Sequence, residues 1–199
     1  MWHGISCLLI LNYILYLCTL NLTCSNLSNM RNFNLHKEKA VNSLLFVTHQ
    51  LEKADTHKTY KILYFADQKH LLKYGRPIFG DTYVKMQYGP VPSFVKNVVD
   101  EEIEGLEEVV AKYHRFNLQP LTEANLDYLS QSDLECLRES IEENKNLSFI
   151  ELTNKSHDDA YNRSYWVINY LDMAKAIGAD EKTLKYINQQ MINESIQLA

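Results

Sequence analysis

The first thirty residues contain no charged side chain, since all 20 Lys and Arg and all 25 Asp and Glu follow Met30. Glycine and proline are also scarce, with six and four among 199 residues, which excludes collagen-like and low-complexity chains. Hydrophobic residues make up 46% of the chain and charged residues 23%, so the chain can bury one well-formed core or two small ones. We therefore expect a globular domain at residues 31–199 that follows an uncharged, apolar leader at residues 1–30.

The uncharged leader has three interpretations. A secretory signal is disfavoured, because no Lys or Arg precedes the apolar run Ile5–Leu22 and no A-x-A-like cleavage site follows it. A membrane anchor would suit this run and would place the basic Arg31, Lys37 and Lys39 on the cytoplasmic side. The third interpretation is a mis-assigned start, with translation beginning at Met30, and we favour it slightly. The domain is then cytoplasmic, and anchored in a membrane only if residues 1–30 are translated.

Cysteines and the common catalytic motifs are missing from the charged part of the chain. Three of the four cysteines lie in the leader, and Cys136 alone cannot form a disulfide framework, which favours an intracellular domain. The sequence contains no G-x-x-x-x-G-K-[ST], G-x-G-x-x-G, G-x-S-x-G or H-E-x-x-H motif. We therefore expect no enzymatic activity, no cofactor, no metal site and no small-molecule substrate.

Apolar periodicity predicts a mainly α fold (α+β), a single compact helical domain with a small antiparallel β-hairpin. Gly75 should cap the second helix, and Ser148 and Glu151 have the spacing of a capping box. Residues 75–92 hold three of the four prolines and three of the six glycines around a short β-like run at 82–87, which indicates a shaped loop. The helices are expected at 35–53, at 58–74, at 93–106 after Pro92, at 130–145, from Ser148 and at 180–196, and the hairpin at 107–119.

Two polar clusters could be read as sites. Asp67 and His70 lie one turn apart on the second predicted helix, and we interpret them as a structural polar pair that ties this helix to the following loop. His157, Asp158 and Asp159 could offer metal ligands. We prefer Asp158 as a helix cap, because capping explains the aspartates without any ligand.

At residues 60–92 the sequence YKILYFADQKHLLKYGRPIFGDTYVKMQYGPVP resembles the signature of the Panacea domain of SocA-like antitoxins. The resemblance covers about residues 35–190. In that family, a K-x-L-Y-x-x-D block with Y-G and G-D-x-Y leads to a G-P-V-P turn, an L-S-x-x-D helix and an L-T-x-x-x-H element. The later two elements correspond here to Leu129, Ser130, Asp133, Leu152, Thr153 and His157.

The resemblance implies a bacterial or phage antitoxin of a type II toxin–antitoxin system, which neutralises a toxin encoded next to it. Its partner is the cognate toxin, bound directly or delivered by the antitoxin as a proteolytic adaptor to a ClpXP-type protease. The alternative is a winged-helix-like DNA-binding regulator that acts on its own operator DNA. Residues 31–96 carry a net charge of +6 and residues 97–199 a net charge of −11, and a basic half favours that alternative.

We predict the toxin-binding surface on the glycine- and proline-shaped turn and on the acidic stretch DEEIEGLEE at 100–108. Aromatic side chains on a rigid turn are typical interface anchors, and carboxylates can contact basic groups of a partner. The predicted surface consists of Tyr83, Gln87, Tyr88, Gly89, Pro90, Val91, Glu101 and Glu102.

Overall fold

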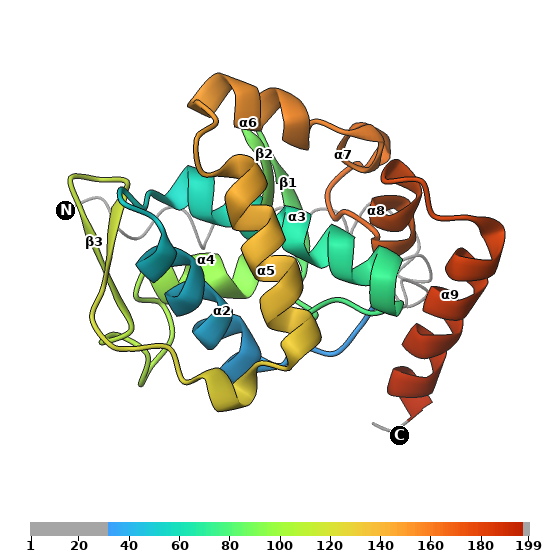
Figure 1. Ribbon diagram of the computed structural model, residues 1–199, viewed down its shortest axis with the longest axis horizontal. Helices are drawn as coiled ribbons and strands as arrows, with labels where there is room; N and C mark the ends of the chain where they lie inside the picture. The colour runs from blue at the N-terminus through green and yellow to red at the C-terminus, as the bar shows by residue number, and fades with distance from the viewer. Residues whose placement is uncertain (1–31, 197–199) are drawn as a thin grey trace, which may run out of the picture. The chain divides into compact units, whose positions relative to one another are not determined.

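Helix α3, Thr56–Tyr74, lies among the other helices of the computed structural model, which describes residues 32–196 (Figure 1). The Asp55 carboxylate begins this helix by accepting a hydrogen bond from the Lys58 amide at 2.8 Å. Gly75 ends it with φ +73°, and its N–H donates to the Leu71 carbonyl oxygen at 2.9 Å. The predicted cap at Gly75 is therefore confirmed. The predictions for the leader lie outside the described residues.

The remaining helices lie around α3. The chain folds mainly into helices with two short hairpins, which confirms the prediction of a mainly α fold with a small β part. Helix α5 crosses α3 in Figure 1, with α2 and α4 below α3, α6, α7 and α8 above it, and α9 beyond its right-hand end. Among residues 32–196, no helix is both long and apolar enough to cross a bilayer. The surrounding helices are α2 (Lys37–Gln50), α4 (Ser93–Val99), the 3-10 turn η2 (Leu126–Tyr128), α5 (Gln131–Asn144), α6 (Phe149–Ser156), α7 (Asp159–Arg163), α8 (Tyr170–Ala176) and α9 (Glu181–Ile196).

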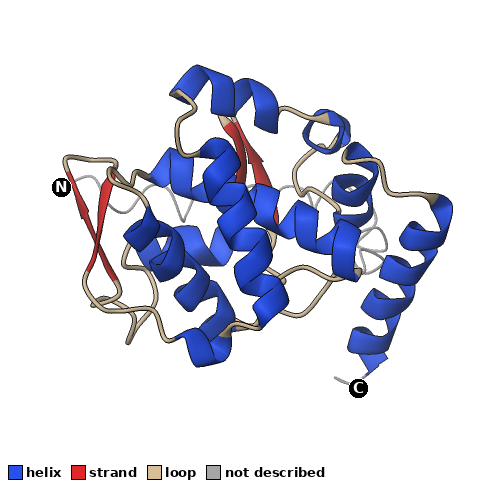
Figure 2. Ribbon diagram, in the orientation of Figure 1, coloured by secondary structure: helices blue, strands red, loops and turns tan. Residues whose placement is uncertain are grey.

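Two antiparallel hairpins accompany the helices (Figure 2). Strands β3 (Val110–Tyr113) and β4 (Asn117–Pro120) form the hairpin expected at 107–119. Strands β1 (Tyr83–Met86) and β2 (Gly89–Pro92) form a second one in the segment that we interpreted as a shaped loop. Prolines are rare in strands because they cannot donate to a ladder. The pairing nevertheless forms, with both prolines opposite β1.

Helix α3 separates two hydrophobic clusters and contributes side chains to each. Ile62, Leu63 and Ala66 belong to the cluster shared with α2, α4 and α5. Tyr64 and Phe65 belong to the cluster shared with α6 to α9. Because α3 is buried on both sides, it shows little of the amphipathic pattern of a surface helix.

Helix starts follow the capping signals in the sequence. Ser148 and Glu151 form the predicted capping box, and Asp158 caps α7 by accepting the Tyr161 amide at 2.9 Å. The helix that begins after Pro92 ends at Val99, so the prediction that it continues through the acidic stretch to residue 106 is wrong. Two residues later the chain enters the left-handed region, at Glu101 with φ +59°, which interrupts the helix.

The start of α4 depends on a buried carboxylate from outside the helix. Asp81 accepts hydrogen bonds from the amides of Phe94 and Val95, at 3.0 and 3.1 Å, and from the Ser93 hydroxyl at 3.1 Å. Pro92, at the cap position, has no side chain that could accept them. Asp81 therefore supplies the missing cap.

We expect Asp81→Ala to lower the free energy of unfolding by about 2–3 kcal/mol, because it leaves buried amide groups without acceptors. The control is Ser148→Ala, which removes an exposed cap and should cost only about 1 kcal/mol. Urea unfolding of both variants measures the difference. Equal losses would contradict the role assigned to Asp81.

Candidate functional site: a cleft beside the β1–β2 turn

An open cleft of about 600 Å³ lies where the start of α3, the two hairpins and the start of α6 meet. Its walls are mostly apolar, and its polar groups come mainly from the first turns of α3. Its position follows from the fold, because four segments that are far apart in the sequence meet at this place. It is lined by Asp55, Thr56, His57, Tyr60, Lys61, Met86, Tyr88, Gly89, Val91, Phe116, Asn117 and Phe149.

Exposed aromatic side chains form the rim of this cleft. Tyr88 is 51% exposed, Phe116 56% and Phe149 49%, and they come from the β1–β2 turn, the β3–β4 turn and α6. The ring of Phe149 stacks on His57 with centroids 4.0 Å apart and meets Tyr88 edge-on at 5.3 Å. These contacts hold large apolar surfaces in place while leaving them open to solvent.

The floor of the cleft contains a buried lysine. Lys61 is 1% exposed, and its Nζ donates to the Pro90 carbonyl oxygen at 2.8 Å. Burial lowers the pKa of Lys61 to about 7. Gly89 packs directly on this side chain, since a Cβ there would lie 2.7 Å from Lys61 Cε and 2.3 Å from Ser156 Oγ. Only glycine leaves room for the lysine at this point.

His57 contributes a neutral imidazole to the wall. Burial, and then the charge of Lys61, lower its pKa to about 4. Its Nε2 lies 3.0 Å from Thr153 Oγ1. The arrangement offers a stacking surface and a cation but no nucleophile with an activating base, and no group of metal-ligating residues occurs among residues 32–196. The cleft is suited to binding.

The structure brings together part of the predicted surface. Tyr88, Gly89 and Val91 line the cleft, the Pro90 carbonyl holds Lys61, and Gln87 is exposed in the same turn. Tyr83 does not reach this surface. Its side chain is buried, and its hydroxyl donates to Asp67 Oδ2 at 2.9 Å.

Glu101 and Glu102 are exposed after α4, and neither is among the described residues that line the cleft. Their neighbour Asp100 forms an ion pair with Lys112 on β3. The acidic stretch is therefore attached to the hairpin whose turn carries Phe116.

Asp67 and His70 both bond the segment after α3. Asp67 Oδ1 accepts the Ile78 amide at 2.7 Å, and His70 Nδ1 lies 2.7 Å from the Arg76 carbonyl oxygen. Burial raises the pKa of Asp67 to about 7, because two hydrogen bonds compensate only part of the lost hydration. Both side chains are buried, and neither lines the cleft.

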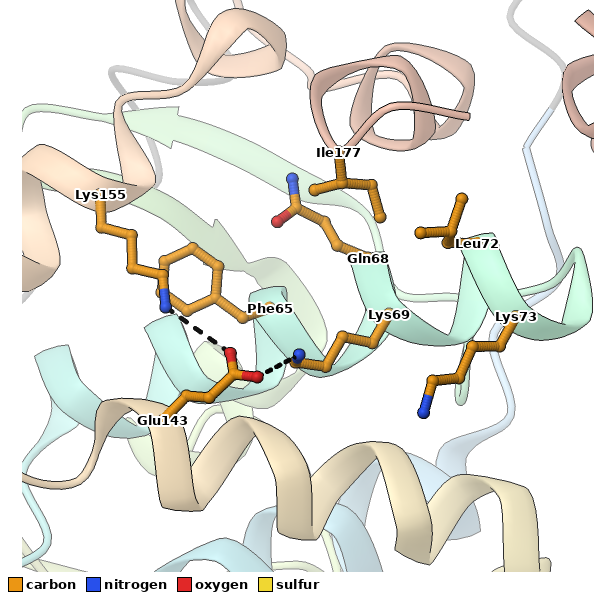
Figure 3. Close-up of a pocket in the computed structure, with 8 residues that line it drawn as sticks. All are labelled: Phe65, Gln68, Lys69, Leu72, Lys73, Glu143, Lys155 and Ile177. Atoms are coloured by element: carbon orange, nitrogen blue, oxygen red, sulfur yellow. Dashed lines mark hydrogen bonds and ion pairs between the residues drawn. The ribbon is translucent and has the colours of Figure 1, made fainter. Parts of the chain in front are cut away.

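A smaller cavity of about 230 Å³ lies on the other side of α3, between α5, α6 and the end of α8. Figure 3 shows Glu143 of α5 between Lys69 and Lys155, with Nζ to carboxylate distances of 2.6 and 3.8 Å. The Lys155 ammonium also lies over the Phe65 ring, 4.7 Å from its centroid. These cations already have partners, which makes the cavity a weaker candidate.

Sequence reasoning missed His57, Phe116 and Phe149 as residues of this site. Phe149 follows a capping serine and Phe116 sits in a hairpin turn, where an apolar residue has no structural need to be. That mismatch between residue type and position is the signal that could have found them.

A helical domain whose main cleft is apolar and rimmed by exposed aromatic side chains has the features of a protein-binding module. The chain belongs to the antitoxin SocA-like family with the Panacea domain, whose pattern matches residues 60–162. This range holds both hairpins and the cleft-lining residues from Tyr60 to Phe149. Membership supports an antitoxin role, with a cognate toxin as the partner. Comparison with curated proteins and with solved structures finds no match.

We expect Gly89→Ala to disturb the floor of the cleft. The matched control is Gly178→Ala, because Gly178 also has a positive φ, of +88°, but a Cβ there would meet no atom within 4 Å. The control should cost about 1–2 kcal/mol for backbone strain alone. Gly89→Ala should cost about 1–3 kcal/mol more, since Lys61 and Ser156 must move. Thermal and urea unfolding measure the loss in the free energy of unfolding for both variants. Similar losses would show that Lys61 and Ser156 can move aside without cost, which would contradict the close packing of the floor.

Proposed function

We propose that this chain neutralises its cognate toxin by binding it through the cleft beside the β1–β2 turn. The observation that carries the proposal is the aromatic rim, in which Tyr88, Phe116 and Phe149 are about half exposed around an open cavity. Exposed aromatic groups of this kind bury large apolar areas when a partner covers them, and they lose little rotamer freedom on binding. Three separate elements present them, so a partner would bridge all three.

Direct neutralisation and delivery to a ClpXP-type protease both begin with this contact. The toxin level in cells with and without the protease separates them, since only an adaptor makes the toxin disappear in a protease-dependent way. We place the interaction in the cytoplasm. A disulfide framework of the kind found in small secreted domains needs several cysteines, and residues 32–196 contain only Cys136, which is buried.

The DNA-binding alternative has less support. A recognition helix needs an exposed face that enters the major groove. Helix α3, the second helix of the basic half, is buried on both sides, and α4, the helix before the β3–β4 hairpin, has no exposed residue. Operator DNA as a further partner is tested by salt-dependent binding to the upstream region at low ionic strength.

Tyr88→Ala and Phe149→Ala should each weaken toxin binding about 30-fold or more, the usual loss when an aromatic anchor is truncated. The matched control is Tyr165→Ala, because Tyr165 is 90% exposed and does not line the cleft. Binding is measured by titration calorimetry with an inactive variant of the toxin from the adjacent gene. If both cleft variants bind like the control, the toxin contacts another surface.

We also propose that the exposed Glu101 and Glu102 contact basic groups of the toxin beside the cleft. The ion pair between Asp100 and Lys112 attaches their segment to the hairpin that carries Phe116. Reversing both charges, E101K with E102K, should slow association several-fold at low salt and have little effect at high salt. Stopped-flow association at two salt concentrations checks this, and a salt-independent rate would contradict it.

A further inference from the structure

The floor of the cleft holds a cation whose hydrogen-bonding capacity is only partly used. The Lys61 ammonium carries three donors, and among residues 32–196 it has one acceptor, the Pro90 carbonyl oxygen. Among the ion pairs of residues 32–196, none involves Lys61. A buried ammonium without a carboxylate is costly, because its hydration is lost and a single dipole replaces it.

The groups around Lys61 cannot compensate its charge. The imidazoles of His57 and His157 both have lowered pKa values, first through burial and then through the charge of Lys61, so both are neutral at pH 7. The nearby carboxylates have other partners. Asp55 caps α3 through the Lys58 amide, and Asp158 accepts from Tyr64, Gln68 and the Tyr161 amide.

We propose that the toxin inserts an Asp or Glu side chain, flanked by apolar residues, into the cleft and that this carboxylate pairs with Lys61. This inference rests on the proposed function, because it assumes that the cleft binds the toxin. Charge complementarity carries it. The apolar rim would exclude water from the pair, which strengthens the attraction, and an amide or an aliphatic group could not replace the carboxylate without leaving the cation unpaired.

The pairing predicts that binding takes up a proton. Burial lowers the pKa of Lys61 to about 7 in the free protein, and a bound carboxylate raises it. Affinity is therefore highest below pH 7 and falls by up to tenfold per pH unit as the pH rises from 7 towards the raised value. His57 and His157 stay neutral above pH 7 and do not contribute over this range.

Lys61→Met tests the pairing on the antitoxin side, since methionine fills a similar volume without charge. Lys58→Met is the matched control, because Lys58 lies nearly one turn earlier on α3, also donates to a carbonyl oxygen (that of Lys145) and does not line the cleft. Toxin binding is measured by calorimetry between pH 6 and 8.5. We expect K61M to bind at least tenfold more weakly at pH 6.5 and to lose the pH dependence, and K58M to keep both the affinity and the pH profile.

Acid-to-amide substitutions in the toxin test the other side with wild-type antitoxin, so the result does not depend on the folding of K61M. One Asp→Asn or Glu→Gln variant of the toxin should bind the wild-type antitoxin about tenfold more weakly than the unchanged toxin does. The same toxin variant should bind K61M as tightly as the unchanged toxin binds K61M. The inference is overturned if K61M keeps the wild-type affinity and pH profile, or if no acidic residue of the toxin shows this coupling. If Tyr88→Ala still weakens binding in that case, the cleft is correct and the carboxylate is not. If Tyr88→Ala has no effect either, the proposed function fails as well.

Discussion

Three buried polar side chains on α3 hold the segment that builds the cleft. Lys61 bonds the Pro90 carbonyl at 2.8 Å, Asp67 accepts the Ile78 amide at 2.7 Å, and His70 bonds the Arg76 carbonyl at 2.7 Å. The segment contains prolines and is too short to satisfy its own backbone groups in a regular sheet, so the helix supplies partners for them. The shape of the β1–β2 turn thus depends on α3, and so does the position of Tyr88 at the rim.

Burial shifts the pKa values of Asp67 and Lys61 in opposite directions. The pKa of Asp67 rises to about 7 and that of Lys61 falls to about 7, mainly because each loses its hydration. Asp67 recovers part of this loss through two hydrogen bonds inside the domain, from the Ile78 amide and the Tyr83 hydroxyl. Lys61 has one such bond and lines an open cleft. The same helix therefore carries one polar group compensated by the fold and one that a partner could compensate.

The local features of the fold were predictable because each depends on a few adjacent residues. The Gly75 cap, the Ser148 capping box and the hairpin after residue 107 are examples. The set of residues that line the cleft could not be predicted, because His57, Phe116 and Phe149 are separated by up to 92 positions and meet only through tertiary packing. Tyr83 illustrates the opposite error. It belongs to the same hairpin as Tyr88, yet alternation along the strand turns it into the core, where it finds Asp67.

The floor and the rim of the cleft differ in what a substitution costs the fold. Changing Lys61 or Gly89 disturbs close packing and a buried hydrogen bond. Changing Tyr88, Phe116 or Phe149 removes side chains that are about half exposed, two of them in hairpin turns and one in the first turn of a helix. The rim can therefore vary with little loss of stability, while the floor is constrained. In a binding module this arrangement lets specificity for the partner reside in the aromatic rim, above a buried lysine whose position the fold itself maintains.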